Sequence, residues 1–246
     1  MAARVVLVHG AWHGAWCWQP VVEGLRAAGV TVDAFDLPGH GEDAMPLTDL
    51  HGDADRVTAA LDALATVEPD PVVLVGHSYG GSVITEAGTH PSVAHLVYIA
   101  AFNVGEGESA AAAAPDDPRA QAIDHSGRPD AGAALVFADD GSTTVTLDGA
   151  VELFYNDCHP SVAAEAAARL TPQPMANLGQ SPARIAWRDR PSTYAICTLD
   201  HAVHPDLQRI LAERCTDQVE WASDHSPFLS HPDLVIDLLA DLARSR

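Results

Sequence analysis

Short apolar runs alternate with amphipathic segments along most of the chain. The segment at residues 4–8 is apolar from residue 5 onward, and those at 72–75 and 96–100 are apolar at successive positions, which is typical of interior strands in a parallel sheet. The same patterns predict further strands at 31–36, 193–197 and 218–222, and helices at 21–28, 53–67, 205–214, after residue 80 up to Gly88, and at the C-terminal end. Strands that alternate with helices predict an α/β fold, a mostly parallel sheet with helices on both faces.

The pattern changes between about residues 103 and 190. Clusters of Ala, Pro, Asp and Gly replace the regular alternation, with short helical pieces at 150–154 and 162–170. A chain of 246 residues that is 47% hydrophobic suits one α/β domain better than two. We therefore expect a single domain, with an α/β core at 1–102 and 191–246 and a small helical cap inserted at 103–190.

The charge of the chain narrows the range of partners. The formal net charge is −21 and all thirteen basic side chains are arginines, with no lysine anywhere. A strongly anionic surface repels phosphate backbones and anionic membranes, so we expect a small-molecule partner, with neither nucleic acid nor membrane. The absence of lysine excludes Schiff-base chemistry and P-loop phosphate binding. A homodimer remains open at this point.

The cysteines and the apolar runs indicate in which cellular compartment the protein is expected and whether it is expected to bind a metal. The four cysteines lie far apart without C-x-x-C spacing, which disfavours a zinc site or a disulfide scaffold. The apolar run at 5–8 is too short for the core of a signal peptide, and no stretch approaches eighteen apolar residues. We expect a cytoplasmic protein with reduced thiols and without a metal or cofactor.

The segment Gly76-His77-Ser78-Tyr79-Gly80 carries the first chemical signal. It matches G-x-S-x-G and lies between a buried strand and a helix, where a nucleophile elbow requires it. The turn is so sharp that side chains larger than glycine two residues on either side would collide with the strand and the helix. Ser78 is therefore the candidate nucleophile, and the alternative is a glycine-rich turn without chemistry.

A serine hydroxyl needs a base and an orienting acid, and in this topology they follow the serine along the chain. His225 comes just after the strand at 218–222, at the carboxyl edge where open α/β sheets place their ligands. Asp200 follows the preceding strand in the same way. We therefore predict His225 as general base and Asp200 as the acid that orients it.

Two other aspartates are weaker candidates for the acid. Asp206 is expected in the first turn of the following helix, where a carboxylate interacts favourably with the helix dipole. Asp224 is adjacent to His225 and is poorly placed to reach its far ring nitrogen. For the oxyanion, the backbone NH groups of Ala11 and Tyr79 are the expected donors, although the His9-Gly10-Ala11 segment could also be a simple turn.

With these residues placed, the chain resembles the α/β-hydrolase superfamily, and more narrowly the plant-type methyl esterase and hydroxynitrile lyase branch with its bacterial relatives. The similarity runs nearly end to end, more loosely in the cap, and is carried by the segments VLVHGAWHGAWCW, DLPGHG, GHSYGG, YAICTLDHAVHP with its following LQR, and DHSPFLSHP. The resemblance implies the triad Ser78, Asp200 and His225, with main-chain oxyanion donors at Ala11 and Tyr79.

The resemblance also separates esterase from lyase. Lyase members have a threonine where this chain has Ala11, and a lysine after the catalytic histidine where it has Ser226. The expected function is hydrolysis of small, uncharged carboxylic esters through an acyl-enzyme. The alternatives are a cofactor-free lyase or perhydrolase on the same triad, and a non-catalytic small-molecule receptor. Aromatic cap residues are candidates for lining the pocket or for the cap core, namely Phe137, Phe154, Tyr155 and Trp187.

Overall fold

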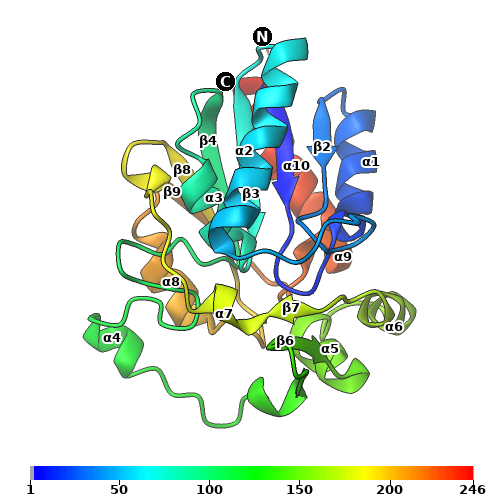
Figure 1. Ribbon diagram of the computed structural model, residues 1–246, viewed down its shortest axis with the longest axis vertical. Helices are drawn as coiled ribbons and strands as arrows, with labels where there is room; N and C mark the ends of the chain where they lie inside the picture. The colour runs from blue at the N-terminus through cyan, green and yellow to red at the C-terminus, as the bar shows by residue number, and fades with distance from the viewer. Residues whose placement is uncertain (1–2, 246) are drawn as a thin grey trace.

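The computed structural model describes residues 3–245, and a six-stranded sheet forms its centre (Figure 1). The spatial order of the strands is β2-β1-β3-β4-β8-β9, and every neighbouring pair in it is parallel. The strands are β1 (Arg4–Val8), β2 (Val32–Ala34), β3 (Val72–His77), β4 (Val93–Ile99), β8 (Ser192–Cys197) and β9 (Asp217–Trp221). The predicted α/β fold with a parallel sheet is confirmed.

Helices cover both faces of this sheet, and each face has its own apolar cluster. One face is covered by α2 (Leu50–Val67), α3 (Gly80–Ala87) and α8 (Pro205–Ala212), and the other by α1 (Gln19–Ala27), α9 (Pro227–Ser230) and α10 (Pro232–Ser245). Alternate residues of β1 point to opposite faces, so Val6 and Val8 join the first cluster and Val5 and Leu7 the second. This two-sided burial explains why the strand is apolar at every position from Val5 to Val8.

Local sequence signals set the ends of the covering helices. Asp49 is the N-cap of α2, and its side chain accepts a hydrogen bond from the backbone NH of Gly52. Gly29 follows α1 with a φ of 77°, a left-handed conformation that glycine adopts without strain. Among residues 3–245, no helix combines the length and the apolar character that a bilayer crossing requires.

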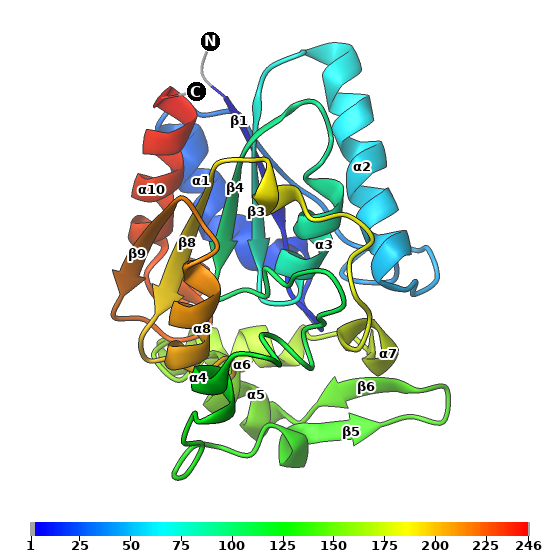
Figure 2. The same ribbon diagram turned by 90° about the vertical axis from the view of Figure 1, so that its left-hand side faces the viewer.

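The chain between β4 and β8 lies across the carboxyl edge of the sheet, and the two termini lie at the opposite end (Figure 2). Its helices are α4 (Pro118–Gln121), α5 (Leu147–Phe154), α6 (Pro160–Ala168) and α7 (Met175–Leu178), with 3-10 turns at η2 (Gly132–Ala134) and η3 (Ala186–Arg188). A three-stranded antiparallel sheet accompanies them: β5 (Leu135–Phe137), β6 (Ser142–Val145) and β7 (Gln173–Pro174). A further 3-10 turn, η1 (Ala15–Trp18), lies between β1 and α1 in the core.

This small sheet corrects the expectation of a helical cap. The helical pieces expected at 150–154 and 162–170 overlap α5 and α6, but the sequence pattern did not predict β5 and β6 before them or β7 after them. Each strand is only two to four residues long, too short for an alternating pattern, and β7 pairs with a strand about thirty residues earlier. Such pairing is a tertiary contact that local periodicity does not report.

Candidate active site

Ser78 lies in the sharp turn between β3 and α3, at the carboxyl edge of the sheet. Its φ of 51° is in the left-handed region, which costs a non-glycine residue on the order of 1–3 kcal/mol. A Cβ atom added to Gly76 would lie 2.6 Å from the carbonyl oxygen of Gly80, and one added to Gly80 would lie 2.5 Å from that of His9. Both glycines are therefore required by close backbone packing, as a nucleophile elbow demands.

His225 and Asp200 are in direct contact after the ends of β9 and β8. The Nδ1 atom of His225 lies 2.7 Å from Oδ2 of Asp200, and both side chains are buried. The other carboxylate oxygen, Oδ1, accepts hydrogen bonds from the backbone NH groups of Ala202 (2.7 Å) and Val203 (2.9 Å). The Asp200 side chain is thereby held in one orientation, and Nε2 of His225 is the ring nitrogen left to face the cavity.

The two weaker candidates for the acid have other contacts. Asp206 is exposed in the first turn of α8, as expected, where its side chain pairs with Arg209 at 2.8 Å. Asp224 is buried, but its Oδ1 accepts hydrogen bonds from Ser226 NH (3.0 Å) and from the Ser230 hydroxyl (2.8 Å). Asp224 thus stabilises the loop after β9 and does not contact the His225 ring.

The main-chain donors expected at Ala11 and Tyr79 lie at the same edge. Both residues line one cavity together with Ser78 and His225. Within the part of the chain that the structure describes, neither backbone NH has a hydrogen-bond acceptor in the protein. Gly10 lets the backbone of this loop lie close to Ser78, because a Cβ at Gly10 would lie only 2.9 Å from Cβ of Ser78.

The cavity has a volume of about 270 Å³ and a predominantly apolar wall. Ser78 and His225 both reach it, and no hydrogen bond joins Oγ to Nε2 among the described residues. Such contacts are often long before substrate binds. The lining comprises Ala11, Trp12, Ser78, Tyr79, Phe102, Ala111, Ala131, Leu135, Leu153, Phe154, Met175, Leu178, Ala202, Val203 and His225.

Only one of the four aromatic residues named from the sequence lines this cavity. Phe154 does, and its ring lies 5.6 Å from the His225 ring, centroid to centroid. Phe137 is 67% exposed on the outer strand β5. Tyr155 is buried and donates its hydroxyl to His13, while the Trp187 indole donates to the carbonyl of Val104. A position in the cap therefore does not by itself show whether an aromatic residue lines the cavity or packs elsewhere.

Two positioning contacts were not predicted. The side-chain amide of Gln208 donates to Oδ2 of Asp200 at 2.8 Å, and Nε2 of His77 donates to the backbone carbonyl of His225 at 2.8 Å. Burial lowers the pKa of His77 well below its usual value, so this ring is neutral. Both residues lie within motifs that carry the family resemblance, LQR and GHSYGG, and these motifs are the sequence feature that could have pointed to them.

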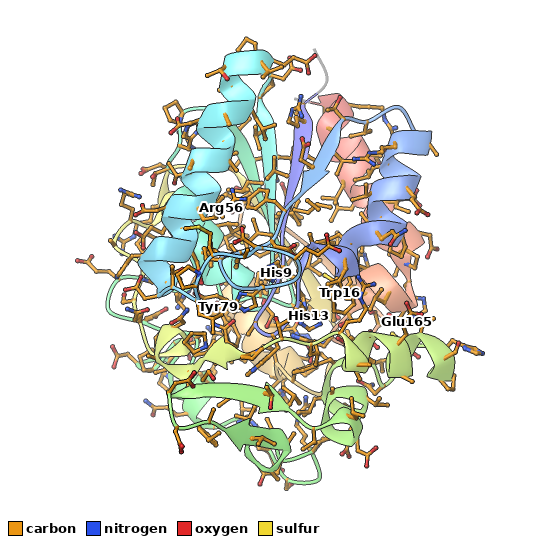
Figure 3. The ribbon with its side chains drawn as sticks, turned by 45° about the vertical axis from the view of Figure 1, so that its right-hand side comes forward. His9, His13, Trp16, Arg56, Tyr79 and Glu165 are labelled. Carbon is orange, nitrogen blue, oxygen red and sulfur yellow. The ribbon has the colours of Figure 1, made fainter. Side chains whose placement is uncertain are left out.

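The loop after β1 brings more buried histidines to this edge, and Figure 3 shows His9, His13 and Tyr79 where the sheet meets the cap. His13 donates from Nδ1 to the carbonyl of Ala11 at 2.8 Å and accepts the Tyr155 hydroxyl at Nε2. Burial lowers the pKa of His13 to about 4, so the ring supports the loop as a neutral group. No cluster of three or more metal-ligating side chains is present within residues 3–245.

Comparison with known proteins gives a consistent picture. Alpha/beta hydrolase nvfD of Aspergillus novofumigatus is 30% identical over 254 residues, 97% of this chain and 96% of its own. Methylesterase 7 of Arabidopsis thaliana is 42% identical over 103 residues, 40% of each chain. The structure of a pyrethroid hydrolase from Sphingobium faniae JZ-2 superposes with a TM-score of 0.81 at 25% identity, over 99% of this chain and 98% of its own. These relatives support the resemblance to methyl esterases.

The family assignment rests on the whole fold and not on the motifs alone. The sequence pattern described as "Alpha/beta hydrolase family" matches residues 5–238, which include both the sheet and the cap. The strand order, the elbow after β3 and the loops after β8 and β9 lie within that match. The chain belongs to the alpha/beta hydrolase family.

Proposed function

We propose that this protein hydrolyses small, uncharged carboxylic esters through an acyl-enzyme on Ser78. One observation carries the proposal: Ser78 and His225 face the same apolar cavity, and His225 is hydrogen-bonded to the buried Asp200. The names of two relatives, a methylesterase and a pyrethroid hydrolase, support ester cleavage. The apolar wall favours an uncharged substrate, because a charged group would lose its hydration there without a partner.

In this mechanism His225 Nε2 takes the proton of the Ser78 hydroxyl as Oγ attacks the ester carbonyl. The negative charge that develops on the carbonyl oxygen is met by the NH groups of Ala11 and Tyr79, each worth roughly 3 kcal/mol in such sites. His225 then gives its proton to the departing alcohol, and a water molecule releases the acid in the same way. Asp200 keeps the proton on Nδ1 and stabilises the imidazolium.

A cyanohydrin lyase is the main alternative on the same residues. Departing cyanide must be met by a positive charge, and leaving a buried anion unpaired costs several kcal/mol. Ser226 follows His225 in this chain and is buried, and the residues that line the cavity include no arginine. Since the whole chain lacks lysine, the site has no cation fit for that role. Ester hydrolysis is the better fit.

The test is a paired assay of 4-nitrophenyl acetate and mandelonitrile with EDTA present. We expect ester hydrolysis without an added cofactor, with negligible cyanide release. Ser78→Ala should abolish covalent labelling by a fluorophosphonate and lower kcat by on the order of 10⁴ to 10⁶. Cyanide release that is faster than ester hydrolysis and depends on Ser78 would favour the lyase. Intact labelling of Ser78→Ala would refute this nucleophile.

A further inference from the structure

A buried carboxylate is bound to Tyr79 but does not itself line the cavity. Asp53, in the first turn of α2, is only 1% exposed. The hydroxyl of Tyr79 donates to its Oδ2 at 2.6 Å and the hydroxyl of Thr48 to its Oδ1 at 2.7 Å. No arginine or histidine bonds to this carboxylate in the described part of the chain, and burial raises the pKa of Asp53 to about 6.

The cap reaches the same carboxylate through Asn177 of α7. The Asn177 amide donates to the backbone carbonyl of Thr48 at 2.8 Å and lies 3.4 Å from both Oδ2 of Asp53 and the Tyr79 hydroxyl. Three residues later, Gln180 accepts from the backbone NH of Leu50 at 2.9 Å. Residues 175–180 of the cap are therefore tied to the start of α2.

Two of the three hydrogen-bond partners of Asp53, Tyr79 and Asn177, have a second role at the cavity. Tyr79 carries a main-chain NH expected to stabilise the oxyanion, and its hydroxyl, at the far end of the ring, is bound to Asp53. Asn177 lies between Met175 and Leu178, which form part of the cavity wall. One carboxylate thus contacts the residue that bears the oxyanion donor and the helix that closes the substrate space.

The composition of this network is unusual for a purely structural core. A buried carboxylate costs several kcal/mol unless hydrogen bonds compensate it, and an apolar residue of similar size avoids that cost. The compensating donors here come from three separate segments: the loop before α2, the nucleophile elbow and the cap. Such a network holds its members in one relative geometry, because moving any of them leaves a buried acceptor unpaired.

We propose that Asp53 is a positioning residue, which fixes Tyr79 at the oxyanion site and seats cap helix α7 over the cavity through Asn177. This inference rests on the proposed esterase function. It predicts that loss of the Tyr79 hydroxyl weakens stabilisation of the transition state, although that hydroxyl is bound to Asp53, which does not line the cavity. It also predicts that loss of the Asn177 amide loosens the cap wall.

The decisive variant is Tyr79→Phe, which removes the hydroxyl and keeps the ring. Its matched control is Tyr98→Phe, since Tyr98 is also fully buried and shares its hydroxyl with Thr85 at 3.1 Å. We expect Tyr79→Phe to lower kcat for 4-nitrophenyl acetate by on the order of tenfold with KM changed less than about twofold, as for an interaction made only in the transition state. Binding of a trifluoromethyl ketone, which forms the tetrahedral adduct, should weaken by the same factor. Tyr98→Phe should match the wild type.

Two further variants separate the partners. Asp53→Asn retains one acceptor oxygen and should preserve more activity than Asp53→Ala. Asn177→Ala should raise KM and speed hydrogen exchange of the amides at 175–180. The exchange measurement needs no turnover, so it tests the seating of the cap even if the ester assay fails.

The outcomes distinguish this inference from the proposed function. A wild-type protein without Ser78-dependent hydrolysis would refute the proposed function. In that case the contact between Asp53 and the cap would still be tested, and it would be refuted by unchanged hydrogen exchange of the amides at 175–180 in Asn177→Ala and Asp53→Asn. An active wild type with Tyr79→Phe equal to Tyr98→Phe in kcat and ketone affinity would refute the positioning role. A Tyr79→Phe effect confined to KM, or to thermal stability, would also refute it.

Discussion

At the scale of single residues, three aspartates compete for one role, and their contacts separate them. Asp200 and Asp224 are equally buried, so burial does not decide between them. The direction of the side chain does, since Asp200 bonds to Nδ1 of His225, whereas Asp224 accepts hydrogen bonds from Ser226 NH and, in the cap, from Asp157 NH. Asp206 lies at the surface with Arg209. A residue is fit to orient the histidine only if its carboxylate reaches the ring.

Asp200→Asn should lower kcat by on the order of 10⁴ while the protein stays folded. An amide that donates to Nδ1 favours the tautomer with the proton on Nε2, and that ring cannot accept the serine proton. The control is Asp206→Asn, which should retain nearly full activity. Steady-state kinetics on 4-nitrophenyl acetate with circular dichroism of each variant checks this. The reverse ranking would mean that the acid is misassigned.

The three main candidates could be found from the sequence because each follows a readable strand. Ser78 comes directly after β3, and Asp200 and His225 lie in the short loops after β8 and β9; the carboxyl ends of parallel strands share one edge. Gln208 and His77 could not be assigned roles in this way. Their contacts with Asp200 and with the carbonyl of His225 depend on side-chain directions in the folded protein, which spacing along the chain does not encode.

At the scale of elements, the core was more predictable than the cap. Strand β1 was predicted with its observed ends, and β3 and β4 were found with shifts of a few residues, because burial on both faces makes a continuous apolar run. Strand β6 has the sequence Ser-Thr-Thr-Val and pairs with β5 and β7. Its four residues give no distinct period, so only tertiary pairing reveals it.

Phe154, at the end of cap helix α5, should control the size of substrate that the cavity admits. Its ring packs on Trp12 at 5.9 Å between centroids and forms part of the wall beside His225. Phe154→Ala should enlarge the cavity and raise kcat/KM for 4-nitrophenyl benzoate relative to the acetate by about tenfold, within the range for apolar pockets. Competition between the two esters in one reaction measures this ratio directly. An unchanged ratio would place the acyl group elsewhere in the cavity.

At the scale of the whole molecule, the fold buries several histidines as neutral groups near the active site. Burial lowers the pKa of His9, His13, His40 and His77. Hydrogen bonds select the neutral ring in two of them: His9 accepts the backbone NH of Leu37 at Nε2, and His13 accepts the Tyr155 hydroxyl there. Protonation of Nε2 in His9 or in His13 would break a hydrogen bond of the loop that carries Ala11.

These histidines predict a loss of stability in mild acid, below about pH 6.5. An unfolded histidine takes up a proton near pH 6.5, whereas His13 in the folded protein does so near pH 4, so the unfolded state binds more protons between these values. The free energy of unfolding therefore falls as pH drops through this window. Asp53 acts in the opposite direction, because its raised pKa of about 6 means that the folded state gains a proton before the unfolded state does. The lowered pKa values of these buried histidines together outweigh the raised pKa of Asp53, so the free energy of unfolding has a net positive slope against pH in this window.

Urea unfolding at intervals between pH 7.5 and 5.0 measures this slope, and variants of single groups assign it. His13→Gln should remove up to about one proton from the linkage, which flattens the slope by up to roughly 1.4 kcal/mol per pH unit. Asp53→Asn should steepen the slope, because it removes a group whose raised pKa opposes the histidines. Stability that stays constant from pH 6.5 to 5.0 would show that the buried rings gain protons without unfolding, contrary to the neutral hydrogen bonds of His9 and His13.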